Sequence, residues 1–240
     1  MSEILPVRQK ENCVLTIAIP AYLEEENLRI LLPRLHKTLM TLPISSEVVV
    51  VDTQTPMDNT RMVCQENNAV YLNRLSGNYY GDAVRTAIQY CTSQYLVFMD
   101  GDGSHAPEFI PSFLRVADTY DVVIASRYVK GGASDNKRYL LFMSKVVNVL
   151  YSVFLGLNCK DVSNSFKLYR TALLKPLTLH SKNFDIIEEL LFKMKRNCKQ
   201  LRILELPFTF KERMFGNTKR NLFIFMLTYL FTLLKLRFGK

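Results

Sequence analysis

The chain has 240 residues, of which 48% are apolar and 22% charged, and its net charge is +9. This composition fits a globular protein with one well-buried core, and it excludes a disordered chain, a collagen and a polytopic membrane protein. The five cysteines are odd in number and form no C-x-x-C pair, so we expect a reducing compartment and neither a disulfide framework nor a zinc ribbon.

The first half of the chain alternates short apolar runs with segments of helical periodicity. Strands are predicted at residues 14–19, 47–51, 69–72, 95–99 and 122–125, and helices at residues 24–42, 59–67, 82–91 and 107–117. Repeated strand–helix units of this length predict an α/β fold, a mostly parallel sheet with helices on both faces. Ligands of such sheets bind at the carboxyl ends of the strands.

The pattern changes after Arg127. Residues 129–138 are polar and contain two adjacent glycines, which predicts a loop, and residues 140–157 predict a strongly apolar helix. Further strands are predicted at residues 165–169 and 201–210, with a helix at residues 184–197 between them. The second half therefore adds at least two strands to the sheet.

The C-terminal residues 222–234 contain no charge. Thirteen residues are too few to span a membrane, which takes about 20 apolar residues. The segment is either a helix that closes the core, or a helix that lies in a membrane interface or against another protein's membrane helices. Basic residues on both sides favour the second interpretation. We therefore predict a main domain at residues 1–220 and an apolar interface helix at residues 221–238.

The net charge is divided between the two halves. Residues 1–110 hold 8 Lys and Arg against 13 Asp and Glu, a net charge of −5, whereas residues 111–240 hold 23 against 9, a net charge of +14. Such an excess indicates either a solvated basic face or an anionic partner: nucleic acid, a phosphate-bearing substrate or anionic lipid.

Two carboxylates, Asp100 and Asp102, directly follow the predicted strand at residues 95–99. At a strand end they can point into one site and hold a divalent cation, typically Mg²⁺ or Mn²⁺ when a diphosphate completes the coordination. An isolated D-x-D also occurs by chance in many loops. Its position after a buried strand, and before Ser104 and His105, favours the metal site. We expect His105 to form structural hydrogen bonds there and not to bind the metal.

Six segments occur in a fixed order: AIPAYLEEENL, VVVVD, DGDGSHAPE, ASRYVKGG, DVSNSFKLYR and KERMFGNTK. Over residues 14–220 this ordered set resembles the family-two glycosyltransferases of the GT-A fold, and more narrowly the dolichol-phosphate mannose synthase branch. The resemblance implies a Rossmann-like sheet, a nucleotide-sugar donor and a divalent metal, Mg²⁺ or Mn²⁺.

The resemblance also implies a role for each matched position. The segment that holds the nucleotide base and ribose falls on Pro20, Tyr22 and Glu24, and the acid of the next turn on Asp52. The metal and diphosphate motif falls on Asp100, Gly101, Asp102 and Ser104, of which Asp100, Asp102 and Ser104 would contact the metal. Arg127 matches the arginine near the sugar and the acceptor phosphate. The loop that closes over the diphosphate falls on Arg213 and Lys219.

The chain departs from its relatives at several positions, and two of these departures bear on whether it is catalytic. Thr53 stands where a second aspartate is usual, and Leu140 stands where relatives carry an arginine four residues before the serine that matches Ser144. These departures keep open the hypothesis of a catalytically silent subunit that binds a nucleotide sugar.

The implied activity is inverting transfer of a hexose, expected to be mannose from GDP-mannose, to a polyprenyl (dolichyl-type) phosphate. We expect the protein at the cytoplasmic face of a membrane, in contact with the membrane surface or with a small membrane-helix partner. A nucleic-acid partner is not expected, because it would explain the charge but not the carboxylates. An alternative acceptor is a sugar hydroxyl, for which Glu188 or Glu189 could be the base. Both glutamates also fit as ordinary residues of an amphipathic helix.

Overall fold

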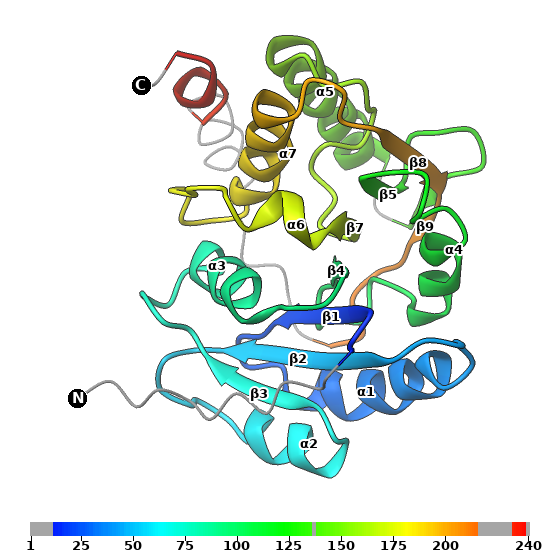
Figure 1. The fold of residues 1–240 in the computed structure, drawn as a ribbon. Helices are drawn as coiled ribbons and strands as arrows, with labels where there is room; N and C mark the ends of the chain where they lie inside the picture. Colours follow the sequence, from blue (N-terminus) through cyan, green and yellow to red (C-terminus); the bar gives the residue numbers. More distant parts are fainter. Residues whose placement is uncertain (1–11, 136–137, 216–231, 239–240) are drawn as a thin grey trace.

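A computed structural model describes residues 12–135, 138–215 and 232–238 of the protein. Its centre is a seven-stranded sheet of order β3-β2-β1-β4-β7-β5-β8 (Figure 1). The strands are β1 (Leu15–Pro20), β2 (Ser46–Asp52), β3 (Val70–Asn73), β4 (Tyr95–Phe98), β5 (Val122–Ser126), β7 (Lys167–Arg170) and β8 (Ile203–Pro207). All neighbouring pairs are parallel except those of β7, which runs antiparallel to both β4 and β5. The predicted mostly parallel sheet is confirmed.

Helices cover both faces of the sheet, as predicted (Figure 1). One face carries α1 (Glu25–Leu39), α2 (Thr60–Glu66) and α4 (Ile110–Leu114), the other α3 (Tyr80–Tyr90), α5 (Arg138–Leu155) and α7 (Ile186–Asn197). A short helix, α6 (Thr171–Leu174), follows β7.

The core forms two clusters, because successive strand residues point to opposite faces. In β1, Ile17 and Ile19 pack under α1, whereas Ala18 between them packs on the side of α3. The strands are apolar on both faces, as expected of a sheet buried between two layers of helices. This alternation fixes the register of the strands, and with it the position of the residues that follow them.

Three sequence predictions about elements need correction. The strand predicted at residues 201–210 is divided: β8 pairs with β5, and then β9 (Thr209–Phe210) pairs with β6 (Ala133–Ser134). The loop predicted at residues 129–138 therefore contains a short strand. The helix predicted at residues 107–117 begins as a 3₁₀ turn, η1 (Pro107–Phe109), before α4.

Residues 232–238 form a helix beside α7 (Figure 1). Leu233 and Leu236 are buried in the same cluster as α7, and Thr232 donates a hydrogen bond to Asp185 at 3.2 Å. This part of the predicted interface helix thus packs one face on the core, while Leu234 and Phe238 are exposed. Residues 221–231 and the predicted boundary after residue 220 lie outside the described residues. None of the described helices has the length and apolarity required to cross a membrane.

Candidate active site

Polar residues gather where the strands end. Pro20 ends β1, Asp52 ends β2, and Asp100 and Arg127 follow closely after β4 and β5. These four strands run in the same direction, so their carboxyl ends share one edge of the sheet. The topology thus brings together residues that are separated by up to about a hundred positions in the sequence.

The loop after β4 presents the two predicted carboxylates. Asp102 accepts hydrogen bonds from the backbone N–H and the hydroxyl of Ser104, at 3.1 and 2.6 Å to Oδ1. Its other oxygen, Oδ2, lies 2.9 Å from Nη2 of Arg213. Asp100 accepts a hydrogen bond from the hydroxyl of Tyr80 at 3.4 Å. Ser104 thus orients Asp102, and Tyr80 contributes a contact that the sequence analysis did not predict.

His105 supports this loop from below. Its imidazole is fully buried, stacks on Phe166 with 4.8 Å between ring centroids, and accepts the backbone N–H of Asp100 on Nδ1 at 2.9 Å. Burial lowers the pKa of His105, although the neighbouring Asp100 and Asp102 oppose the shift. A neutral ring with an acceptor at Nδ1 matches the observed contact. The prediction of a structural role is confirmed.

Glu24 lies directly over Gly101. A Cβ at Gly101 would stand 3.6 Å from Cγ of Glu24, in ordinary contact, and Asn27 donates a hydrogen bond to Glu24 at 2.6 Å. Burial raises the pKa of Glu24 to about 7; the hydrogen bond from Asn27 opposes the rise and the Asp102 carboxylate adds to it. Three predicted site residues, Glu24, Gly101 and Asp102, are therefore neighbours.

The segment that carries Arg213 is fixed to the same loop. The backbone N–H groups of Lys211 and Met214 donate to the carbonyl oxygens of Ser104 and Asp102, at 3.2 and 2.9 Å. Met214 packs against Gly103, whose φ of +80° favours glycine and whose missing side chain leaves room for the Met214 side chain. Arg213 is thus a loop residue whose guanidinium contacts Asp102. Lys219 lies outside the described residues.

At the end of β2, Asp52 is buried and its carboxylate accepts a hydrogen bond from the hydroxyl of Tyr71 at 3.0 Å. Burial raises the pKa of Asp52. Arg74 is also buried. Its backbone N–H donates a hydrogen bond to the backbone carbonyl of Asp52 at 3.0 Å, and its guanidinium donates one to the backbone carbonyl of Ala21. Arg74 thereby links the ends of β1, β2 and β3. Tyr22, which follows β1, is half exposed. Arg74 was missed in the sequence analysis, although it directly follows a strand.

Arg127 forms a two-pronged ion pair with Asp161. Its Nη2 and Nε lie 2.7 and 2.9 Å from the two carboxylate oxygens, and its backbone N–H donates to the same carboxylate at 2.8 Å. The guanidinium lies 5.6 Å from the centroid of the Phe210 ring, and that ring lies 5.5 Å from the His105 ring. Arg127 is therefore linked to the carboxylate loop through one aromatic side chain, that of Phe210.

The donor set of the carboxylate loop limits which metal it can hold. No group of three His, Cys, Asp or Glu side chains is arranged for metal binding within residues 12–135, 138–215 and 232–238. Asp100 and Asp102 offer two carboxylates, which fits Mg²⁺ or Mn²⁺ when the remaining ligands are substrate oxygens and water.

Comparison with known proteins adds the family. Residues 16–178 match the family model described as glycosyl transferase family 2. The chain belongs to glycosyl transferase family 2. It is 34% identical over 220 residues to an undecaprenyl-phosphate mannosyltransferase of Micrococcus luteus, with 87% of each chain covered. It is 32% identical over 212 residues to a dolichol-phosphate mannosyltransferase of Pyrococcus furiosus, and covers 58% of that longer protein and 85% of this chain.

Solved structures support the fold of this family-two glycosyltransferase. Glucosyl-3-phosphoglycerate synthase from Mycobacterium tuberculosis superposes with a TM-score of 0.71 at 15% identity, over 94% of this chain and 80% of that one. That structure contains Mn²⁺, UDP and the product glucosyl-3-phosphoglycerate, and another structure of the synthase contains Mg²⁺ and UDP. The predicted GT-A fold is confirmed.

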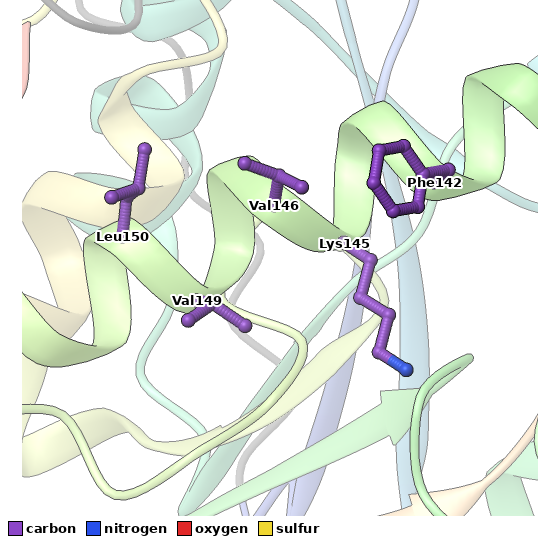
Figure 2. A pocket seen from close by; sticks show the side chains of 5 residues that line it. All are labelled: Phe142, Lys145, Val146, Val149 and Leu150. Carbon is purple, nitrogen blue, oxygen red and sulfur yellow. The ribbon is translucent and has the colours of Figure 1, made fainter.

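The glycosyltransferase carries an exposed apolar face on α5. Phe142 and Val153 are 70 and 72% exposed. Figure 2 shows the side chains that line a shallow pocket on this helix: Phe142, Lys145, Val146, Val149 and Leu150. Exposed apolar side chains thus follow one another along one side of α5, with Lys145 among them.

Glu188 and Glu189, the candidate bases for a hydroxyl acceptor, are both buried in α7. Glu189 forms an ion pair with Lys193 at 2.7 Å and accepts backbone N–H groups of His180 and Ser181. These contacts lower its pKa, although burial opposes them. Glu189 is thus a structural anion.

Proposed function

We propose that this glycosyltransferase transfers a hexose, mannose from GDP-mannose, to the phosphate of a polyprenyl phosphate with inversion at the anomeric carbon. The observation that carries the proposal is the position of Arg127, which is linked through the Phe210 ring to His105 of the carboxylate loop and through Ser163 to α5, the helix that has an exposed apolar face. A phosphate at Arg127 could therefore belong to a lipid. The two mannosyltransferases similar to this chain are named for polyprenyl-phosphate substrates.

In this proposal the donor lies along the edge of β1, β2 and β4. Pro20, Tyr22 and Asp52 hold the nucleoside, with Glu24 beside them. A Mg²⁺ or Mn²⁺ ion bound by Asp100, Asp102 and Ser104 would stabilise the negative charge of the leaving diphosphate. Arg213, 2.9 Å from Asp102, would donate hydrogen bonds to the same diphosphate, together with Lys219.

The acceptor requires no general base. A phosphate monoester is ionised near neutral pH, so one of its oxygens can attack the anomeric carbon directly. A carbon–oxygen bond to the acceptor forms as the bond to the diphosphate breaks, and no proton leaves the acceptor. The protein then has to orient the two phosphates and exclude water. Arg127 would hold the acceptor phosphate in line.

The membrane contact belongs to the same proposal. The apolar face of α5 would lie in the interface, and the basic second half of the chain would attract anionic headgroups. The predicted helix at residues 221–238 would extend this surface. In its described part, Leu234 and Phe238 are exposed. The side of the membrane would be cytoplasmic, as the free cysteines suggest. A membrane-helix partner on this surface is part of the proposal.

The decisive experiment incubates the protein and Mn²⁺ with labelled GDP-mannose, UDP-glucose or UDP-N-acetylglucosamine and a polyprenyl phosphate, followed by extraction of the lipid. We expect label in the lipid with GDP-mannose, and an anomeric configuration opposite to that of the donor. Label transferred only to soluble sugars would favour the hydroxyl acceptor. Nucleotide binding without any transfer would favour a silent binding subunit.

A further inference from the structure

α5 has a buried side opposite its apolar face, and that side contains a buried amide. Asn148 is 1% exposed. Its Oδ1 accepts the backbone N–H of Ser163 at 2.9 Å, and its Nδ2 donates to the carbonyl of Ser144 at 2.8 Å and to the hydroxyl of Ser163 at 2.9 Å. A buried amide with its oxygen and nitrogen both bonded specifies one geometry, because each lost contact would leave a buried polar group without a partner.

The partner of Asn148 is also a partner of Arg127. Nη2 of Arg127 lies 3.2 Å from Oγ of Ser163 and 2.7 Å from Oδ1 of Asp161. The guanidinium is therefore held by two residues of one short loop, and Asn148 connects that loop to α5.

The rest of the loop is fixed from the sheet. The carboxylate of Glu205 in β8 accepts the backbone N–H groups of Lys160 and Asp161, at 2.7 and 2.9 Å. The ammonium of Lys167 in β7 donates to the carbonyl of Val162 at 2.9 Å. The sheet thus holds the loop from below, and Asn148 sets its distance from the helix.

We propose that Asn148 is a positioning residue for Arg127, and through Arg127 for the acceptor phosphate. The inference rests on the proposed function and specifies how α5 is coupled to the site. In this coupling, the helix that binds the lipid also fixes the guanidinium that binds the lipid's phosphate. An apolar residue at position 148 would leave Ser163 without both contacts and allow Arg127 to shift. A displacement of about 1 Å of a positioning group can cost about a hundredfold in rate.

The test compares Asn148→Leu with Ser152→Ala. Leucine keeps the branching of asparagine at Cγ, although it is larger, and it removes every hydrogen bond of the amide. Ser152 is a polar residue on the same helix that bonds the carbonyl of Leu157 and not the 161–163 loop. We expect Asn148→Leu to raise the acceptor KM and lower kcat, a combined loss of about 10- to 100-fold, with the nucleotide-diphosphate Kd changed less than twofold. Ser152→Ala should keep wild-type acceptor KM.

A milder variant covers the case in which Asn148→Leu folds poorly. Ser163→Ala removes only the hydroxyl, so the backbone contact with Asn148 remains. We expect a smaller rise in acceptor KM. The double variant, Asn148→Leu with Ser163→Ala, should lose less than the product of the two single losses, because both substitutions act on Arg127 through the Ser163 hydroxyl. The inference would be overturned if the double variant lost as much as the product of the two single losses. It would also be overturned if Asn148→Leu had the same acceptor KM as Ser152→Ala. Either result would leave the proposed function standing. Wild-type protein without any transfer to polyprenyl phosphate would overturn the proposed function, and this inference with it.

Discussion

Two arginines of the candidate site form ion pairs with aspartates: Arg213 with Asp102 and Arg127 with Asp161. The Arg213–Asp102 ion pair has one exposed partner, so its guanidinium can exchange the carboxylate for a phosphate at small cost. We expect Arg213→Ala to weaken nucleoside-diphosphate binding by about tenfold or more, since a charge-assisted contact is lost, while the nucleoside alone binds as before. Calorimetric titration with both ligands measures this, with Arg202→Ala as a control that removes an arginine paired with Asp121 instead. Equal losses for both ligands would mean that Arg213 is structural.

Asp102 is the carboxylate that contacts both Ser104 and Arg213. Asp102→Asn keeps the size of the side chain and an oxygen for Ser104, but removes the charge that a divalent cation needs. Because a metal contributes several kcal/mol to the transition state, we expect turnover to fall by about 100-fold or more with little change in the melting temperature. Glu66→Gln, a charge removal on the exposed pair with Arg29, is the control. Half of the wild-type rate in Asp102→Asn would contradict the metal assignment.

Lys167 gives the protein a defined dependence on pH. Burial lowers its pKa from 10.5 to about 8, although Asp161 and Glu188 oppose the shift. Between pH 8 and 10.5 the folded state binds fewer protons than the unfolded state, so the free energy of unfolding rises with pH. Below pH 8 the lysine is charged in both states, and the full cost of its buried charge lowers the stability. From pH 7 to 9.5 we expect the free energy of unfolding of the wild type to gain about 2 kcal/mol relative to Lys167→Met. Urea denaturation of both proteins at the two pH values measures this; a constant difference would contradict it.

Among the elements, the helix α5 has one buried side and one exposed, apolar side. If the exposed side lies in a membrane interface, Phe142→Glu with Val153→Glu should reduce binding to anionic vesicles by about tenfold or more, since each charge opposes burial among acyl chains. Flotation with phosphatidylglycerol vesicles measures the bound fraction. Met40→Glu with Met62→Glu places the same charges at exposed positions on the α1 and α2 side and should bind as wild type does. Equal flotation of both variants would remove α5 from the interface.

The helix at residues 232–238 contributes to the core through one face only. Leu233 is 2% exposed and Leu234 46%. We expect Leu233→Ala to lower the free energy of unfolding by about 2–5 kcal/mol through lost burial and the cavity that remains. Leu234→Ala should change it by less than about 0.5 kcal/mol. Chemical denaturation of the two variants compares neighbouring leucines directly, and equal effects would contradict the packing of this helix on α7.

At the scale of the whole molecule, the sequence predicted what local patterns encode. Apolar runs located β1 at residues 14–19 against the observed Leu15–Pro20, and the strand-end rule placed Asp52, Asp100 and Arg127 at one edge. The two-residue strands β6 and β9 are too short for a periodic signal. The pairing of Arg213 with Asp102 joins residues 111 positions apart, and no spacing rule reports such a contact. The hydrogen bonds that Glu189 accepts from His180 and Ser181 depend likewise on the conformation of the segment before α7.

The antiparallel strand β7 has a consequence for synthesis on the ribosome. Four adjacent strands of the sheet, β1 to β4, lie within residues 15–98. They can therefore pair with one another as soon as they emerge. The next strand made, β5, has neighbours that are both translated later, β7 and β8. The four residues of β4 are all buried in the folded protein. One edge of β4 therefore has no neighbouring strand until β7, which ends at Arg170, has been synthesised. During that interval the nascent chain presents an open apolar edge, the kind of surface that chaperones cover and that aggregation exploits.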